Sequence, residues 1–127
     1  MNQMLKIAIC DHEQPIRDYL KKLTQACTDA DVYVFPDGET LLSDQTDYDV
    51  ILLDISLDQE HGTDTFNGID VARKIRERSD AIIIFVTALK EYVFEGYDVG
   101  AFHYLLKPID EQQFPMVRRL ALSRFPV

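Results

Sequence analysis

Four consecutive apolar residues, Val50 to Leu53, lead directly into an aspartate, Asp54. An unbroken apolar run of this length is typical of a strand that is buried on both faces, as in a parallel sheet. In open α/β sheets, ligands and chemistry collect at the carboxyl ends of the strands. We therefore expect Asp54 to lie where a functional site would form.

Apolar segments of strand length alternate with segments whose apolar residues recur at helical spacing. The predicted strands are 5–10, 32–35, 49–53, 81–86 and 101–106, and the predicted helices are 15–27, 38–43, 69–78, 90–99 and a last one from 110. Such alternation predicts a parallel sheet with helices on both faces. The expected fold is a flavodoxin-like (βα)5 doubly wound sheet with strand order 2-1-3-4-5.

Several residues mark where the predicted helices begin and end. Pro15 suits the first turn of a helix, and Gly100 is a typical residue just past the end of one. Asp110 can cap the last helix. The dipeptide Asn67-Gly68 predicts a turn at the end of a long acidic loop.

Composition and charge limit the classes of function. The 127 residues form one domain, and the net charge of −9 argues against direct nucleic acid binding by this domain. No apolar stretch approaches the ~18 residues that a membrane span needs, and no signal-peptide pattern is present, so we expect a cytoplasmic protein. Cys10 and Cys27 lack metal-type spacing and are expected to be reduced thiols.

Polar side chains follow four of the five predicted strands. They are Asp11, His12 and Glu13 after the first strand, Asp54 after the third, Thr87 after the fourth and Lys107 after the fifth. These strand ends are neighbours in the expected order, so the side chains should converge. Two carboxylates brought together repel unless a cation lies between them, and oxygen ligands with few protein donors suit Mg²⁺. A carboxylate beside such an ion can attack phosphorus to give an acyl phosphate.

Four motifs at these strand ends resemble a known family. They are Ile-Cys-Asp (9–11), Leu-Leu-Asp-Ile (52–55), Val-Thr-Ala (86–88) and Tyr-Leu-Leu-Lys-Pro (104–108). In this order they resemble the response-regulator receiver domain of two-component signalling, over about residues 4–122. Segment 90–108 resembles the subgroup whose receivers precede a LytTR-type DNA-binding domain. The resemblance implies a single receiver domain over 1–127, with the output domain absent from this chain.

The resemblance implies a phosphorylation site and its metal. Asp54 would accept a phosphoryl group from a histidine kinase. Asp11, Asp54 and the backbone carbonyl of Ser56 would hold Mg²⁺. Lys107 would pair with the phosphoryl group, and the bond between Lys107 and Pro108 would be cis. The domain would also slowly hydrolyse its own acyl phosphate, so it would not be a conventional enzyme.

The resemblance also implies a switch. Thr87 matches the switch hydroxyl and Tyr104 the switch aromatic, and together they would change the face formed by the fourth helix, fifth strand and fifth helix. That face would control an output, expected to be transcription, and is the expected surface of a homodimer. Tyr92, Phe94 and Tyr97 cannot all face inward on one helix, so at least one of them should be exposed.

Two features depart from the family's pattern. His12 stands where the family has a second metal-ligating acid, and histidine favours Zn²⁺ or other transition ions over Mg²⁺. The loop 57–67 is longer than usual and carries Asp58, Glu60, His61 and Asp64. It is either a solvated insertion or a source of a replacement ligand or of altered kinase recognition.

Two other functions stay open at this stage. Because of His12, the domain could be a degenerate, phosphorylation-independent receiver that acts as a protein-interaction or dimerisation module. The other is an unrelated flavodoxin-like enzyme that binds a mononucleotide, which the absence of a glycine-rich loop after the first strand disfavours.

Overall fold

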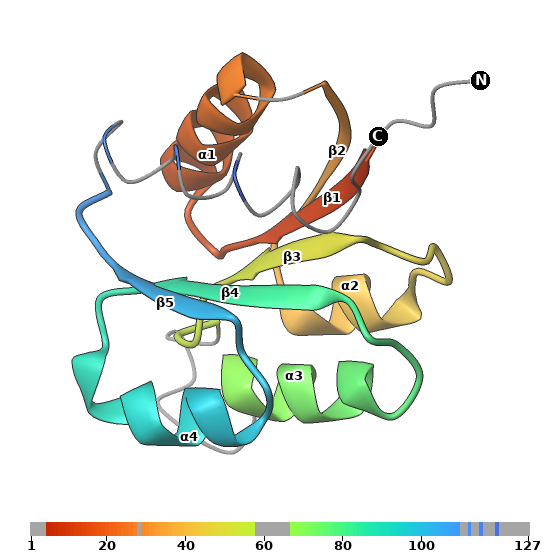
Figure 1. Ribbon diagram of the computed structural model, residues 1–127, viewed down its shortest axis with the longest axis vertical. Coiled ribbons are helices and arrows are strands. Elements are labelled where there is room, and N and C mark those ends of the chain that lie inside the picture. The colour runs from red at the N-terminus through yellow and green to blue at the C-terminus, as the bar shows by residue number, and fades with distance from the viewer. Residues whose placement is uncertain are drawn as a thin grey trace.

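A five-stranded parallel sheet forms the centre of the computed structural model, which describes residues 5–27, 29–57, 67–109, 112, 115 and 119 (Figure 1). The strands are β1 (Leu5–Cys10), β2 (Ala30–Phe35), β3 (Val50–Leu53), β4 (Ile82–Thr87) and β5 (His103–Leu106). Their order is β2-β1-β3-β4-β5 and every neighbouring pair is parallel. The predicted fold and strand order are confirmed.

Helices cover both faces of the sheet. They are α1 (Gln14–Cys27), α2 (Gly38–Ser43), α3 (Gly68–Arg76) and α4 (Val93–Asp98), with a short 3₁₀ turn, η1 (Lys90–Tyr92), before α4. Figure 1 shows α1 on one side of the sheet and the other three helices on the opposite side. No helix in the described ranges is long and apolar enough to cross a membrane.

The central strands bury both of their faces, which is why they read as continuous apolar runs. Alternate residues belong to two separate cores. On one side Ile7 and Leu52 pack with residues of α1, and on the other Ile51 and Phe85 pack with residues of α2 and α3. All four residues of β3 are buried. The chain therefore reaches Asp54 directly from the centre of the core.

The dipeptide Asn67-Gly68 begins α3, so the predicted turn at this position is wrong. The Oδ1 atom of Asn67 accepts hydrogen bonds from the backbone N–H groups of Ile69 at 2.8 Å and Asp70 at 3.3 Å. The carboxylate of Asp70 accepts one from the N–H of Asn67 at 3.0 Å. This reciprocal capping box satisfies amides that a helix start otherwise leaves free.

Other boundaries differ slightly from the prediction. Segment 90–99 begins with the 3₁₀ turn η1, which is common at the start of an α-helix, and no side chain caps η1 or α4. Gly100 follows α4 with φ 78°, a left-handed conformation that glycine adopts without strain. The predicted last helix with its cap Asp110, like loop residues 58–66, lies outside the described residues.

Replacing Gly68 by alanine should destabilise the fold. A Cβ atom at this position would lie 2.2 Å from the carbonyl oxygen of Asp54 and 2.7 Å from the Cα of Ile55. Because both are backbone atoms, they cannot rotate aside, and we expect the free energy of unfolding to fall by about 1–3 kcal/mol or more. Urea unfolding followed by circular dichroism measures the change.

The matched control is Lys74→Ala, an exposed position on the same helix. It should change the free energy of unfolding by less than about 0.5 kcal/mol. Equally small changes in the two variants would contradict the close contact between α3 and the end of β3.

Candidate functional site

The ammonium of Lys107, just after β5, lies between two buried carboxylates. Its Nζ is 2.9 Å from Oδ2 of Asp11 and 3.0 Å from Oδ2 of Asp54. Both aspartates are only 1% exposed. The Oε1 atom of Glu13 lies 3.5 Å from the same ammonium. Side chains that the sequence predicted to converge from separate strand ends therefore meet around one cation.

The backbone holds one oxygen of each carboxylate. Oδ1 of Asp54 accepts a hydrogen bond from the N–H of Ser56 at 3.0 Å, and Oδ1 of Asp11 accepts one from the N–H of Glu13 at 2.9 Å. In each case the second oxygen faces the ammonium of Lys107. Both carboxylates are thus fixed in orientation before any ligand arrives.

Main-chain bonds place these residues at the sheet edge. The N–H of Asp54 donates to the carbonyl of Cys10 at 3.0 Å, and that of Lys107 donates to the carbonyl of Thr87 at 2.9 Å. The bond between Lys107 and Pro108 is cis, as the resemblance implied. Cys10 is a free, buried thiol, and burial raises its pKa well above the usual range. The side chain of Cys27 lies outside the described part of the chain.

Burial and the neighbouring charges shift the pKa values of Asp11 and Lys107 in opposite directions. Burial raises the pKa of Asp11, and the hydrogen bonds from Glu13 and Lys107 only partly offset it. Burial alone would lower the pKa of Lys107, but the hydrogen bond to Asp11 and the charge of Asp54 outweigh it and raise this pKa. Lys107 is therefore charged at neutral pH and compensates the carboxylates.

Asp11, His12 and Asp54 form a cluster of three metal-ligating side chains. One ligand atom from each lies within 4.8 Å of the others. Nδ1 of His12 is 3.6 Å from Oδ2 of Asp54 and 3.9 Å from Oδ1 of Asp11. Nδ1 is buried and has no hydrogen-bond partner in the part of the chain that the structure describes. Two carboxylates and an unpartnered imidazole nitrogen fit a divalent cation.

Thr87 and Tyr104, the predicted switch residues, are joined through the backbone of Leu89. The Oγ1 atom of the fully buried Thr87 accepts a hydrogen bond from the N–H of Leu89 at 3.4 Å. The hydroxyl of Tyr104 donates to the carbonyl of the same residue. The ring of Tyr104 packs against Phe85, with ring centroids 5.9 Å apart, and burial raises the pKa of Tyr104 to about 12.

Sequence reasoning missed three residues that shape the site. They are Arg17, whose Nη1 donates to the carbonyl of Asp11 at 2.7 Å, Leu89, and Gly68, which packs on the backbone of Asp54. Of these three, only Gly68 could have been found from the sequence nearby, because a glycine directly after an asparagine cap allows another part of the backbone to pack closely. The carbonyl of Ser56 stays a predicted ligand, and the predicted loop residues 58, 60, 61 and 64 lie outside the described ranges.

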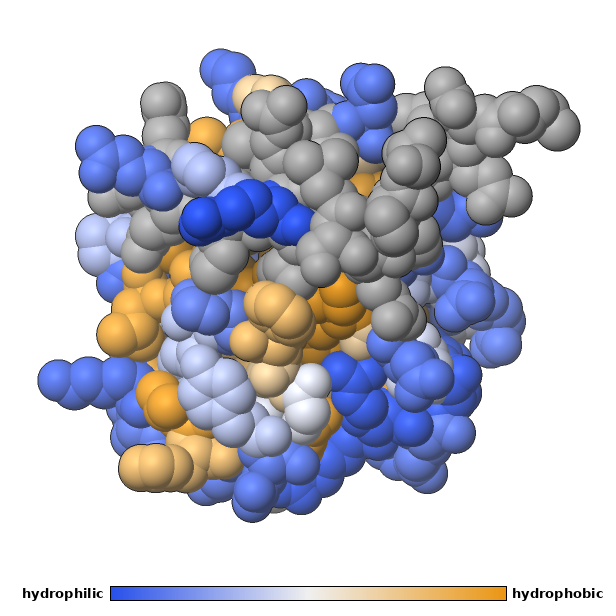
Figure 2. Space-filling model, in the orientation of Figure 1, coloured by the Kyte–Doolittle hydropathy of each residue, from blue (hydrophilic) through white to orange (hydrophobic). Residues whose placement is uncertain are grey.

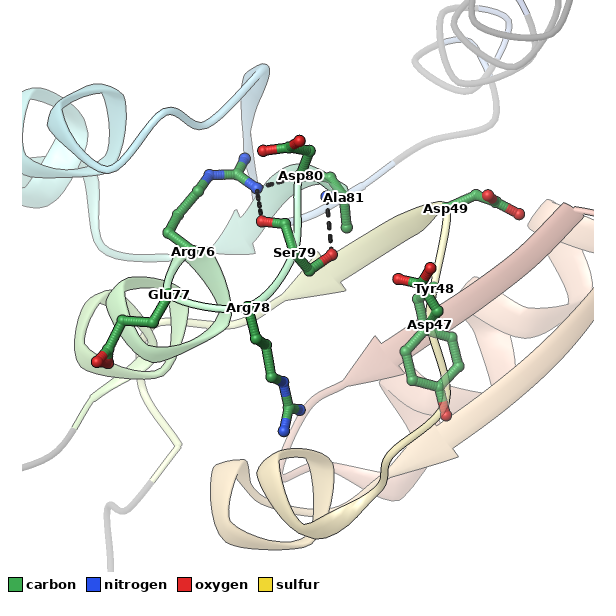
Figure 3. Close-up of a pocket in the computed structure, with 9 residues that line it drawn as sticks. All are labelled: Asp47, Tyr48, Asp49, Arg76, Glu77, Arg78, Ser79, Asp80 and Ala81. Atoms are coloured by element: carbon green, nitrogen blue, oxygen red, sulfur yellow. Dashed lines mark hydrogen bonds between the residues drawn. The ribbon is translucent and has the colours of Figure 1, made fainter.

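A polar cavity of about 500 Å³ lies at the opposite, amino edge of β3 and β4 (Figure 3). Arg76 lines it, but the guanidinium already donates to the carbonyls of Ala81 at 2.6 Å, Gly100 at 2.9 Å and Val99 at 3.1 Å. Arg76 therefore ties the end of α3 to the start of β4 and the end of α4. Arg78, the second arginine of the lining, donates to the carbonyls of Leu42 at 3.1 Å and Asp44 at 3.3 Å. We assign this cavity a structural role, because both arginines are already engaged by carbonyls of the chain.

Replacing Lys107 by methionine should destabilise the fold at neutral pH, because two buried carboxylates would lose the cation between them. We expect a loss of about 3–5 kcal/mol in the free energy of unfolding. Because the pKa of Asp11 is raised, its neutral form stabilises the fold at low pH, and this contribution is lost as the pH rises through the folded pKa. The deficit of the variant should shrink on acidification towards that pKa.

Urea unfolding across a pH series, in buffer free of divalent ions, measures this deficit. Lys90→Met, at an exposed position, is the matched control and should be close to neutral at every pH. In the wild type, the contribution of Lys107 should persist until the pH rises through its own raised pKa. A deficit that stays constant or grows on acidification would contradict the ion-pair account.

Comparisons with known proteins agree with this geometry. Residues 7–117 match the family described as the response regulator receiver domain. The chain is 35% identical over 128 residues to the sensory transduction protein LytT of Oceanobacillus iheyensis, covering 94% of this chain and 47% of that protein. It is 30% identical over 114 residues to LytT of Bacillus subtilis, covering 87% and 45%. The chain thus spans about half the length of these curated relatives.

Solved structures show the same fold. The response regulator DrrB of Thermotoga maritima superposes with a TM-score of 0.81 at 28% identity, covering 96% of this chain and 54% of that one. The response regulatory domain of protein mrkE from Klebsiella pneumoniae superposes with a TM-score of 0.83 at 25% identity, covering 94% and 97%. With its family match, its strand order and its converging strand-end residues, the chain belongs to the response-regulator receiver domains of two-component signalling.

Proposed function

We propose that Asp54 accepts a phosphoryl group from a phosphohistidine of a partner kinase. The observation that carries this proposal is the ammonium of Lys107, held between the buried carboxylates of Asp11 and Asp54. A carboxylate is a weak nucleophile, and it acts on phosphorus only where the charge of the transferred oxygens is neutralised. Lys107 supplies one such positive charge at hydrogen-bond distance from the acceptor.

The transfer is a displacement at phosphorus. A carboxylate oxygen of Asp54 forms the new bond to phosphorus as the bond to the imidazole nitrogen of the phosphohistidine breaks, and that nitrogen keeps the electron pair. The N–H of Ser56 and the ammonium of Lys107 keep the carboxylate oriented. A divalent cation held by Asp11, Asp54 and the carbonyl of Ser56 would neutralise the phosphoryl oxygens. Attack of water on the acyl phosphate later returns the free carboxylate and phosphate, at a slow rate.

The switch follows from the hydrogen bonds at Leu89. When a phosphoryl group is present, the hydroxyl of Thr87 turns to donate to it and gives up its contact with the N–H of Leu89. The loop before η1 then moves, and the hydroxyl of Tyr104 loses its carbonyl partner at Leu89. The phosphoryl group thereby shifts a population between two arrangements of the α4–β5 surface.

The α4–β5 surface exposes large apolar side chains. Phe94 is 86% exposed, Phe102 54%, Tyr97 48% and Leu106 41%. Figure 2 shows hydrophobic side chains gathered on the face that carries α4 and β5 in Figure 1. We infer that phosphorylation pairs this surface with the same surface of a second copy. The predicted share of the last helix lies outside the described residues.

Support for the phosphorylation-independent alternative is lacking, because the acceptor, the lysine and the switch hydroxyl all occupy the strand ends where phosphorylation needs them. The LytT relatives are named sensory transduction proteins and are about twice as long as the region matched. We propose that this receiver controls a DNA-binding output of the LytTR type, which accords with the resemblance of segment 90–108.

Incubation with acetyl phosphate and Mg²⁺ or Mn²⁺ should add one phosphoryl group to the protein, as measured by intact mass. Asp54→Asn should reduce the modified fraction to background, because an amide is not nucleophilic enough to replace the carboxylate. Asp47→Asn, an exposed carboxylate at the other sheet edge, is the matched control and should be modified like the wild type. Equal labelling of the Asp54 variant, or none of the wild type with either ion, would overturn the proposal.

Sedimentation velocity tests the paired surface. With fluoroberyllate as a phosphoryl mimic, the wild type should shift from monomer towards dimer, and Phe94→Asp should stay monomeric because it places a charge in an apolar contact. Tyr19→Asp, an aromatic 37% exposed on α1 at the other face, should still dimerise. A Phe94 variant that dimerises as well as the Tyr19 variant would place the contact elsewhere.

A further inference from the structure

The imidazole of His12 is half-buried, and its Nδ1 atom lies beside two carboxylates without bonding to either. Its Nδ1 has no hydrogen-bond partner among the described residues, although the side chain as a whole is 26% exposed. Leaving a buried polar nitrogen unpaired costs free energy. Nδ1 of His12 lies 3.6 Å from Oδ2 of Asp54 and 3.9 Å from Oδ1 of Asp11, and both distances are too long for hydrogen bonds. Some other group should satisfy this nitrogen.

These distances are compatible with three ligands on one ion. Two ligands at about 2.1 Å from the same metal lie about 3 Å apart when adjacent and at most about 4.2 Å apart. The separations at His12 fall within that range.

The side chain of Glu13 lies near the other ring nitrogen of His12. Imidazoles that bind metals commonly direct their other ring nitrogen towards a carboxylate, which orients the ring and makes it a better ligand. Nε2 of His12 lies 3.9 Å from Oε1 of Glu13, which is too long for a hydrogen bond. Glu13 is therefore the carboxylate near the second ring nitrogen, but no hydrogen bond joins the two side chains in this structure.

We propose that His12 makes this receiver's cation site selective for divalent transition ions that accept imidazole, such as Co²⁺ or Zn²⁺, over Mg²⁺. An imidazole in place of an acid removes one negative charge, which weakens the attraction for the hard Mg²⁺ ion. The nitrogen donor at the same time retains affinity for ions that accept imidazole. The inference rests on the proposed function in that the ion would be the one assisting phosphoryl transfer to Asp54.

Calorimetric titration with Co²⁺ and with Mg²⁺ tests the selectivity on the intact chain. His12→Asp should tighten binding of Mg²⁺ and weaken that of Co²⁺. Because loss of an orienting partner alone changes metal affinity 10–100-fold, loss of the ligand should lower the ratio of the two affinities by at least about tenfold. His103→Gln is the matched control, since this histidine lies at the start of β5, far from the cluster, and its ratio should equal that of the wild type.

Proton NMR of the Co²⁺-loaded protein tests the ligand directly. A paramagnetic ion on Nδ1 should shift the exchangeable ring N–H of His12 far outside the normal range. That signal should be absent in His12→Asn and present in His103→Gln. This readout does not depend on phosphorylation.

The outcomes separate this inference from the function of Asp54. An affinity ratio unchanged in His12→Asp, a wild type that binds neither ion, or a Co²⁺ spectrum without the shifted N–H would each overturn the selectivity. Phosphorylation of Asp54 could still proceed in those cases. A selective Co²⁺ site in a protein whose Asp54 accepts no phosphoryl group would support the selectivity and contradict the proposed function.

Discussion

The arrangement of residues at the carboxyl edge of this sheet depends on one contact, that of the Lys107 ammonium with the buried carboxylates of Asp11 and Asp54. Removing Asp11 and Asp54 from water costs several kcal/mol per charge unless partners compensate it. Lys107 compensates both, while one backbone amide holds each remaining oxygen. The strand order makes this possible, because β4 lies between β3 and β5 and Lys107 must reach across the end of β4. A different order would leave the carboxylates unpaired.

The same arrangement supports the proposal that the site takes up a phosphoryl group and a metal ion together. Two carboxylates outnumber one ammonium, so the site at rest still favours a further positive charge. A phosphoryl group adds negative charge, which would strengthen the attraction of the site for a cation. The residue next to Asp11 is His12, whose side chain offers a nitrogen donor where a carboxylate would offer an oxygen. With a nitrogen donor in place of an acid, we expect the site's affinity to depend less on total charge and more on whether the ion accepts an imidazole ligand.

The strands and their order were predictable because burial on both faces leaves continuous apolar runs, as in β3. Asp54 and Lys107 come after strands that lie near each other in this order, so the order alone predicted that their side chains would converge. Other features depend on contacts between distant residues and were not predictable. Asn67 reads locally as part of a turn, but it caps α3 because the helix start packs on the end of β3. The sequence showed that His12 is unusual, but only the fold shows its nitrogen between two carboxylates.

The central claim is that Asp54, and neither of its acidic neighbours, carries the phosphoryl group. Borohydride reduction of the phosphorylated protein converts an aspartyl phosphate to homoserine, and peptide mass spectrometry then locates the converted residue. The account predicts homoserine at position 54 alone, in protein treated with either a phosphorylated kinase or acetyl phosphate. Conversion at Asp11 or Glu13, or unmodified Asp54 in protein that has taken up phosphate, would contradict it.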